Sequence, residues 1–114
     1  MADNSIYINV EEGVKRVMNN TKLYSKLLVK FKDDIHLNEI EKALLEGNGD
    51  KAKDAAHTLK GLAANLSLSE LFKQVAELEA QIKAGNLNSG QLAQVKDIYV
   101  KTLKEADEVI ARYA

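Results

Sequence analysis

The chain has 114 residues, which is enough for one domain around a single hydrophobic core and too few for two such domains. It carries 16 basic and 17 acidic residues, a net charge of −1, so it lacks the basic excess with which nucleic-acid-binding proteins neutralise phosphates. It has no cysteine, no signal-peptide pattern and no run of about 18 apolar residues, so we expect a cytoplasmic protein without disulfides, thiolate metal sites or membrane spans.

The N-terminal segment predicts a lead-in followed by a short helix. Residues 1–8 are expected to be loosely held, although Ile6 and Ile8 can pack on the rest of the fold. Asn9 is a suitable N-cap, because its side-chain oxygen can accept from the free N–H groups of a first turn. We therefore expect a helix over residues 10–19, whose apolar positions have helical spacing: Val10, Val14, Val17 and Met18.

Two further helices are expected before the middle of the chain. The second should cover residues 22–33 with Thr21 as its cap, and the third should begin near His36. We interpret His36 as a surface or capping residue, because no glycine, lysine and small residues follow it closely. The expected inward positions are Leu23, Leu27, Leu28 and Phe31 on the second helix, and Leu37, Ile40, Leu44 and Leu45 on the third.

A polar turn follows, in which Asp50 can cap an Ala- and Leu-rich helix over residues 52–66. Successive helical residues turn by about 100°, which gathers the alanines and leucines in one arc. The arc consists of Ala52, Ala55, Ala56, Leu59, Leu62, Ala63 and Leu66. His57 lies opposite this arc, so it should stand in the middle of the solvent-exposed face.

Gly61 lies one turn beyond His57 on the same exposed face. A glycine inside a helix costs about 1 kcal/mol relative to alanine, and on an exposed face it gains no packing in return. We interpret it as space that a partner needs to approach the backbone beside His57. Lys60 adds a cation for an incoming anion. An exposed imidazole, an open approach and a nearby ammonium suit a nucleophile that carries a phosphoryl group.

Two longer helices complete the chain. Ser67 and Glu70 have the spacing of a capping box for a helix over residues 68–84, and Ser89 can cap a last helix over residues 90–112. Short connections make neighbouring helices antiparallel. The sequence therefore predicts an all-α fold, an antiparallel up-down four-helix bundle with one or two short accessory helices at its N-terminal end. No apolar stripe is left over once the core is filled, so we expect a monomer.

The run His57-Thr58-Leu59-Lys60-Gly61, followed by Ala63-Ala64-Asn65-Leu66, closely resembles the signature of histidine-containing phosphotransfer (HPt) domains. Residues 10–16 and 23–31 are similar to the first two helices of that family. Leu71, Leu78 and Glu79 match the apolar and polar positions that are typical of its next helix. The resemblance implies a single HPt-like domain over residues 1–114. Ser67 is the main departure, because the family pattern usually has there a glycine that permits a left-handed turn.

The resemblance also implies a role for each site residue in a phosphorelay of two-component signal transduction. His57 would accept a phosphoryl group from the aspartate of a receiver domain and pass it to another receiver. Lys60 would stabilise the spread negative charge, and Gly61 would keep the approach open. The family's polar partner of the histidine matches Glu79, which would accept from Nδ1–H or else be an ordinary solvated residue. Lys83 would contact the phosphate or pair with Glu79.

The implied partners are response-regulator receiver domains and a hybrid sensor histidine kinase, with no nucleic acid and no membrane. The receiver would bring Mg²⁺, so the chain should need no metal or cofactor of its own. Exposed apolar residues of the first helix, such as Val14 or Met18, would contribute to the docking patch.

Two alternatives stay open at this point. The chain could be the histidine-bearing domain of a chemotaxis-type kinase, phosphorylated by a separate ATP-binding domain, or a helical scaffold without phosphotransfer. Residues 47–49 lack the Gly-Lys-Ser/Thr ending of a phosphate-binding loop, and no kinase or ATPase signature occurs elsewhere. The sequence thus favours a phosphoryl carrier with a phosphohistidine intermediate and leaves open whether it is an enzyme.

Overall fold

Six helices make up the part of the chain that the computed structural model describes, which is residues 6–113 without the side chain of Ser89. They are α1 (Val10–Arg16), α2 (Thr21–Phe31), α3 (His36–Leu45), α4 (Gly49–Asn65), α5 (Ser69–Ala84) and α6 (Ser89–Tyr113). Residues 6–113 contain no strand, and no described helix combines the length and apolar character needed to cross a bilayer.

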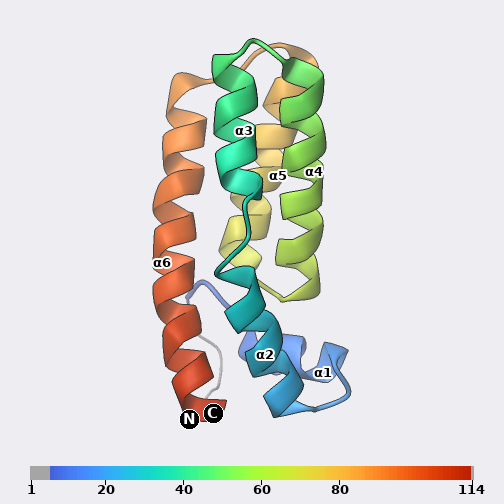
Figure 1. The fold of residues 1–114 in the computed structure, drawn as a ribbon, viewed down its shortest axis with the longest axis vertical. Coiled ribbons are helices and arrows are strands. Elements are labelled where there is room, and N and C mark those ends of the chain that lie inside the picture. The colour runs from blue at the N-terminus through green and yellow to red at the C-terminus, as the bar shows by residue number, and fades with distance from the viewer. Residues whose placement is uncertain (1–5, 114) are drawn as a thin grey trace.

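Four helices, α3, α4, α5 and α6, run side by side along the long axis of a molecule that measures 43 × 22 × 20 Å (Figure 1). α4 packs against α3 on one side and α5 on the other, while α6 packs against α5 and α2. α2 lies at the lower end beneath α3, and α1 lies at that same end (Figure 1). The predicted all-α four-helix bundle is confirmed, with α1 and α2 as short accessory helices.

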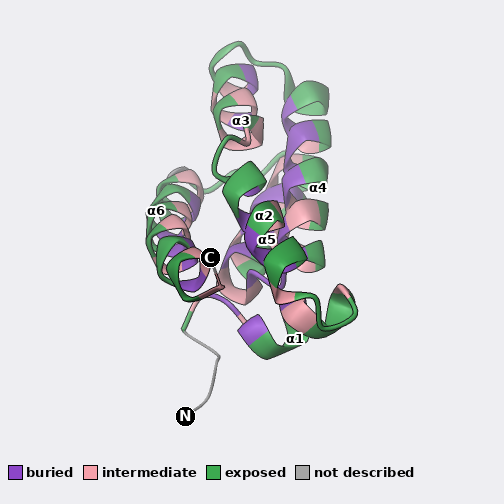
Figure 2. Cartoon of the chain, turned by 60° about the horizontal axis from the view of Figure 1, so that its bottom comes forward, coloured by how far each residue is buried: buried purple, intermediate pink, exposed green. Residues whose placement is uncertain are grey.

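The core lies between the inner faces of the helices, where the buried residues face one another (Figure 2). Four alanines of α4 are buried, and their small side chains let α3 and α5 approach α4 closely. Each fully buried leucine or valine contributes about 1.5–3 kcal/mol to stability. The larger core residues include Leu28, Phe31, Ile40, Leu59, Leu71, Val75, Leu78, Val95 and Val109.

α1 is shorter than the sequence predicted. Asn9 caps it as expected, since its Oδ1 accepts from the N–H of Glu12 at 3.1 Å. The helix nevertheless ends at Arg16, because Met18 and Asn19 adopt left-handed conformations with φ of 58° and 62°. The chain therefore leaves the helix three residues earlier than predicted.

The predicted lead-in is only partly described, because residues 1–5 lie outside the described residues. Ile8 is fully buried, as expected, whereas Ile6 is 77% exposed and does not pack on the core. The N–H of Tyr7 donates to Glu105 at 2.9 Å, which ties this segment to α6. From Tyr7 onward the segment is therefore held in place.

Two predicted helix caps are wrong by one or two residues. Asn20 rather than Thr21 caps α2, and Asn48 rather than Asp50 caps α4. In each case the asparagine oxygen accepts from the backbone N–H three residues on, at 2.9 Å and 3.1 Å. The prediction failed because two nearby residues could cap each helix. Asparagine is the better capping residue beside threonine, whereas asparagine and aspartate cap about equally well, so only the structure selects Asn48 over Asp50.

Tyr24 of α2 occupies the core position that the sequence predicted for Leu23. Tyr24 is fully buried, whereas Leu23 is 40% exposed. The Tyr24 hydroxyl donates to the carbonyl of Leu66 at 2.6 Å, which satisfies its polar atom. Gly13 makes room for the ring, since a Cβ at Gly13 would lie 2.5 Å from it. This contact fixes α2 against both α1 and the end of α4.

α3 begins at His36, as expected, and Asp34 secures its start. One oxygen of Asp34 accepts from the N–H of His36 at 3.0 Å, and the other lies 2.7 Å from Nδ1 of the same residue. Leu45, predicted to point inward, is 84% exposed, because Ile40, Ala43 and Leu44 form the inner face of α3 and Leu45 is turned by about 100° from Leu44.

The turn between α4 and α5 differs from the predicted capping box. Ser67 has φ of 58°, so it makes the left-handed turn that a glycine would make, and it caps nothing. Its hydroxyl instead donates to Glu12 at 2.8 Å, and its carbonyl accepts from the N–H of Asn9 at 2.8 Å. These bonds offset the strain of a left-handed serine, and they join the turn to α1. Glu70 pairs with Lys73 instead.

α5 and α6 agree with their predicted ranges to within one residue. α5 ends at Gly85, which is left-handed with φ of 67°. The predicted cap by Ser89 concerns a side chain outside the described residues. On α6 one side of the helix faces the core, with Val95, Thr102, Ala106 and Val109 buried.

Candidate functional site

His57 stands on the outer face of α4, near the middle of the helix. The neighbouring Ala55, Ala56 and Leu59 are buried against α3 and α5, and this leaves His57 pointing away from the core. Its side chain is 71% exposed. The position is the one that the helical periodicity of α4 dictates, because a residue opposite the apolar arc must face solvent.

Glu79 of α5 holds one ring nitrogen of His57. Nδ1 of His57 lies 3.0 Å from Oε2 of Glu79, whose side chain is only 4% exposed. An ionised carboxylate can only accept, so a neutral imidazole in this contact carries its proton on Nδ1. Nε2 then keeps its lone pair, and within residues 6–113 it has no hydrogen-bond partner. The arrangement presents Nε2 as a nucleophile.

Two lysines share the same carboxylate. Nζ of Lys60 lies 2.6 Å from Oε1 of Glu79, and Nζ of Lys83 lies 3.9 Å from Oε2. Burial tends to raise the pKa of Glu79, but the hydrogen bonds from Lys60 and His57 and the charges of both lysines lower it below its ordinary value. Glu79 is therefore an anion at neutral pH, when it can hold Nδ1–H.

Gly61 borders open space. A Cβ built on Gly61 would meet no atom within 4 Å, so no packing within the described protein requires a glycine there. The backbone beside His57 is accordingly reachable from outside. A partner that comes close to the helix beside His57 requires this open space.

The structure brings His57, Lys60, Glu79 and Lys83 into one network and leaves His36 out of it, since His36 pairs with Asp34. Of the two alternatives for Lys83, the ion pair with Glu79 is present, and its side chain is 58% exposed. Among the described residues no three His, Cys, Asp or Glu side chains are grouped so that they could hold a metal ion.

The contact between Lys60 and Glu79 was missed at the level of sequence. Glu79 follows Val75 by four residues and so continues the buried side of α5. A carboxylate at a buried position needs cationic or N–H partners, and this requirement was the available signal. Val14 is half-buried while Met18 is 90% exposed, so only Met18 of the expected docking residues is fully accessible.

A family model described as Hpt domain matches residues 27–109, a range that holds α3, α4, α5 and most of α6 together with the whole His57 network. No curated protein and no solved structure gives a significant match. Hpt domains carry out histidine phosphotransfer in two-component signalling, where they work with receiver domains and kinases. The match covers most of the chain, and the protein belongs to the Hpt domain family.

Proposed function

We propose that the protein is a phosphorelay carrier: His57 accepts a phosphoryl group from the aspartate of one receiver domain and passes it to another. The observation that carries this proposal is the exposed imidazole of His57, whose Nδ1 is held 3.0 Å from the buried carboxylate of Glu79. Burying a carboxylate is costly unless it is paired. A surface histidine without a function would not need a buried carboxylate beside its ring.

The transfer step balances without an added acid or base. The Nε2 lone pair attacks the phosphorus of the aspartyl phosphate, the N–P bond forms, and the P–O bond breaks to leave the aspartate carboxylate. Nδ1–H keeps its proton throughout. The imidazole ring gains positive charge as the bond forms, and the Glu79 carboxylate behind it stabilises that charge. The reverse step returns the phosphoryl group to the aspartate of a second receiver.

Lys60 and Gly61 have supporting roles in this proposal. Phosphoryl transfer depends on positioning and on stabilising charge spread over three oxygens. Lys60 is anchored by Glu79 and is still 28% exposed, so its ammonium can turn part of its hydrogen bonding toward an incoming phosphoryl group. Gly61 leaves the space through which the receiver brings that group. Mg²⁺ belongs to the receiver in this scheme.

The experiment supplies label from two sources. The unaltered protein, His57→Gln and His36→Gln are incubated with a ³²P-phosphorylated receiver domain, and separately with ATP and a histidine kinase domain. We expect acid-labile, base-stable label from the receiver on the unaltered protein and on His36→Gln, and none on His57→Gln. Label that survives in His57→Gln would contradict the assignment. Label from the kinase domain alone would favour the chemotaxis-type alternative, and label from neither source would favour a scaffold.

A further inference from the structure

The two lysines that share the Glu79 carboxylate are held very differently. Nζ of Lys60 lies 2.6 Å from Oε1, close enough for a charged hydrogen bond, and its side chain is largely buried. Nζ of Lys83 lies 3.9 Å from Oε2, beyond hydrogen-bond distance, and its side chain is exposed. An exposed ion pair of this kind contributes little to stability. The unphosphorylated structure therefore gives Lys83 no strong structural role.

Phosphorylation of His57 changes what Lys60 binds. The phosphoryl group attaches to Nε2, whereas Glu79 holds Nδ1 on the other edge of the imidazole ring. An ammonium that moves to the phosphoryl oxygens, beyond Nε2, moves away from Oε1 of Glu79. The carboxylate is almost fully buried, and it would then lose its shortest ion pair while the positive ring still depends on it. A buried anion that loses a partner is destabilised unless another cation replaces that partner.

Lys83 is placed to be that replacement. It follows Glu79 by four residues on α5, and a glutamate that precedes a lysine at this spacing is the favourable order for an ion pair. A movement of about 1 Å would bring its Nζ from 3.9 Å to hydrogen-bond distance of the carboxylate. Lys83 breaks no other contact in this movement, because residues 6–113 offer it no further ion pair or hydrogen bond.

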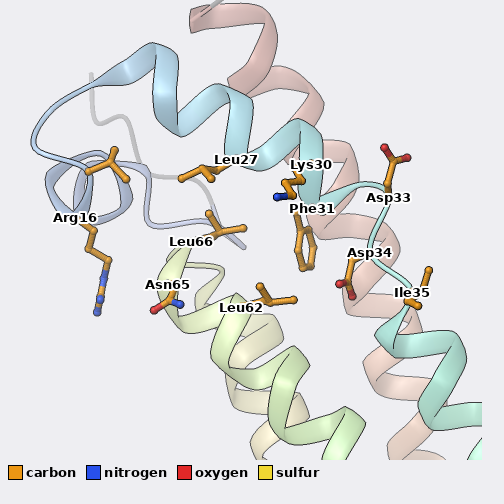
Figure 3. Close-up of a pocket in the computed structure, with 11 residues that line it drawn as sticks. Arg16, Leu27, Lys30, Phe31, Asp33, Asp34, Ile35, Leu62, Asn65 and Leu66 are labelled. Carbon is orange, nitrogen blue, oxygen red and sulfur yellow. The ribbon is translucent and has the colours of Figure 1, made fainter.

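No other cation of the described residues can take this place. Besides the two lysines, only His57 lies within ion-pairing distance of the Glu79 carboxylate among residues 6–113. Lys30 lies on the other side of α4, where it lines a groove of about 800 Å³ between α2 and the end of α4 (Figure 3). If Lys60 leaves the carboxylate, Lys83 is therefore the cation that remains.

The charges of the site balance only when both lysines take part. One carboxylate and two ammonium groups leave the unphosphorylated site with an excess of positive charge, which attracts an anionic donor. A phosphoryl group adds a charge of about −2, and the protonated ring adds one positive charge. With Lys83 the phosphorylated site is close to neutral. Without Lys83 it would carry an uncompensated negative charge beside a buried carboxylate.

We propose, on the basis of the proposed function, that Lys83 is a positioning residue that takes the place of Lys60 on the Glu79 carboxylate during phosphoryl transfer. Lys60 turns to the phosphoryl oxygens, and Lys83 closes on the carboxylate. The carboxylate thus has a cation at each stage and continues to accept from Nδ1–H of His57. The exchange moves no proton and changes no covalent bond, and it reverses when the phosphoryl group leaves.

NMR observes the exchange directly at mildly alkaline pH, where phosphohistidine persists. The protein carries ¹⁵N in its lysine side chains and ¹³C in its glutamate carboxyl groups, and phosphoramidate phosphorylates it without a receiver. Scalar coupling across the hydrogen bond between a lysine Nζ and the Glu79 carboxyl carbon reports which lysine is bound. We expect this coupling from Lys60 before phosphorylation and from Lys83 after it. Coupling that stays with Lys60, or coupling of Lys83 to ³¹P, would overturn the proposal.

Transfer kinetics test the same exchange with a matched control. Lys83→Met removes the charge and nearly keeps the length of the side chain, whereas Lys83→Arg keeps the charge. Lys101→Met is the control, because Lys101 also forms an i,i+4 ion pair, with Asp97 on α6, and has no contact with Glu79. We expect Lys83→Met to lower the rate at saturating phosphorylated receiver about three- to fivefold, with KM within about twofold. Lys83→Arg and the control should keep the parental rate within about twofold.

The outcomes separate this proposal from the proposed function. Equal saturated rates for Lys83→Met and Lys101→Met would overturn the exchange. The same loss in Lys83→Arg as in Lys83→Met would also overturn it, because the exchange depends on charge. If phosphoramidate labels His57 but no phosphorylated receiver does, the proposed function is overturned instead, and the NMR couplings still decide whether the lysines exchange.

Discussion

The two sides of α4 use charge in opposite ways. Toward α5, Glu79 is 4% exposed and lies among a ring nitrogen and two ammonium groups, so its charge is neutralised within the protein. Toward α2, Lys30 lines an apolar groove between α2 and the end of α4, and it has no hydrogen-bond or ion-pair partner inside residues 6–113. Paired charges fix geometry, and unpaired charges stay available to another molecule. The comparison separates the atoms proposed to carry out transfer from a surface whose charge is not used within the described residues.

The largest effect is expected from the paired side, with Glu79→Ala. This change removes the acceptor of Nδ1–H and the anion behind the ring, so transfer should slow by on the order of 10²-fold. Glu79→Gln should slow transfer less than Glu79→Ala does, because an amide oxygen can still accept a hydrogen bond from Nδ1–H of His57. Glu77→Ala, an exposed glutamate of the same helix, is the control. If Glu79→Ala keeps a rate within about twofold of the parent, the network is structural only.

Gly61→Gln tests the open approach beside His57. Glutamine is a good helix former, and no atom lies within 4 Å of the Gly61 Cβ position, so the variant should melt no lower than the parent. Its rate of phosphorylation should fall at least about tenfold, which corresponds to about 1.4 kcal/mol in the barrier. Gly49→Gln is the matched control, since that glycine also borders open space on α4. If Gly61→Gln is phosphorylated at the rate of the parent, the open space at Gly61 has no role in transfer.

Lys60→Ala should have a smaller effect, roughly three- to tenfold on the rate at saturating receiver. The loss is limited because Lys83 remains 3.9 Å from Glu79. KM should change little, since Lys60 lies on the side of α4 toward α5 and not in the groove. Lys51→Ala, in the first turn of α4, serves as the control. A rise in KM without a fall in the saturated rate would mean that Lys60 belongs to docking.

The smallest effect concerns stability against pH. The pKa of Glu79 is lowered from its ordinary value of 4.5, so the folded state binds its proton less readily than the unfolded state does. Its contribution to the free energy of unfolding is present above pH 4.5 and is lost as pH falls through the lower folded value. Urea unfolding of the parent and of Glu79→Gln should therefore differ at pH 7 and converge toward pH 3. A difference that persists at pH 3 would point to packing instead of charge.

Much of the fold could be predicted from periodicity, because each helix buries one apolar face and its spacing is visible in the residues. The errors lie at helix ends. Asn20 and Thr21 can both cap, and only the surrounding structure selects one. Ser67 adopts the left-handed turn of a glycine because Glu12 and Asn9 bind it, and both lie more than fifty residues away in the chain.

The site likewise has features that could be predicted from the sequence and features that depend on how the helices pack. The exposure of His57 follows from the helical wheel of α4, and Glu79 was placed by resemblance, whereas its contact with Lys60 depends on how α5 packs on α4. The groove could not be predicted, because its shape depends on the angle at which α2 meets α4. The Tyr24 hydroxyl, which donates to the carbonyl of Leu66, joins α2 to that end of α4. No local pattern in the sequence reports such a contact.

The most direct test is to identify which nitrogen of which histidine carries the phosphoryl group. Protein labelled with ¹⁵N is phosphorylated by a receiver domain, and the histidine ring nitrogens are observed by long-range ¹H–¹⁵N correlation with ³¹P coupling. We expect phosphorus on Nε2 of His57, with the proton on Nδ1 facing Glu79. Phosphorus on Nδ1 of His57, or on His36, would contradict the account.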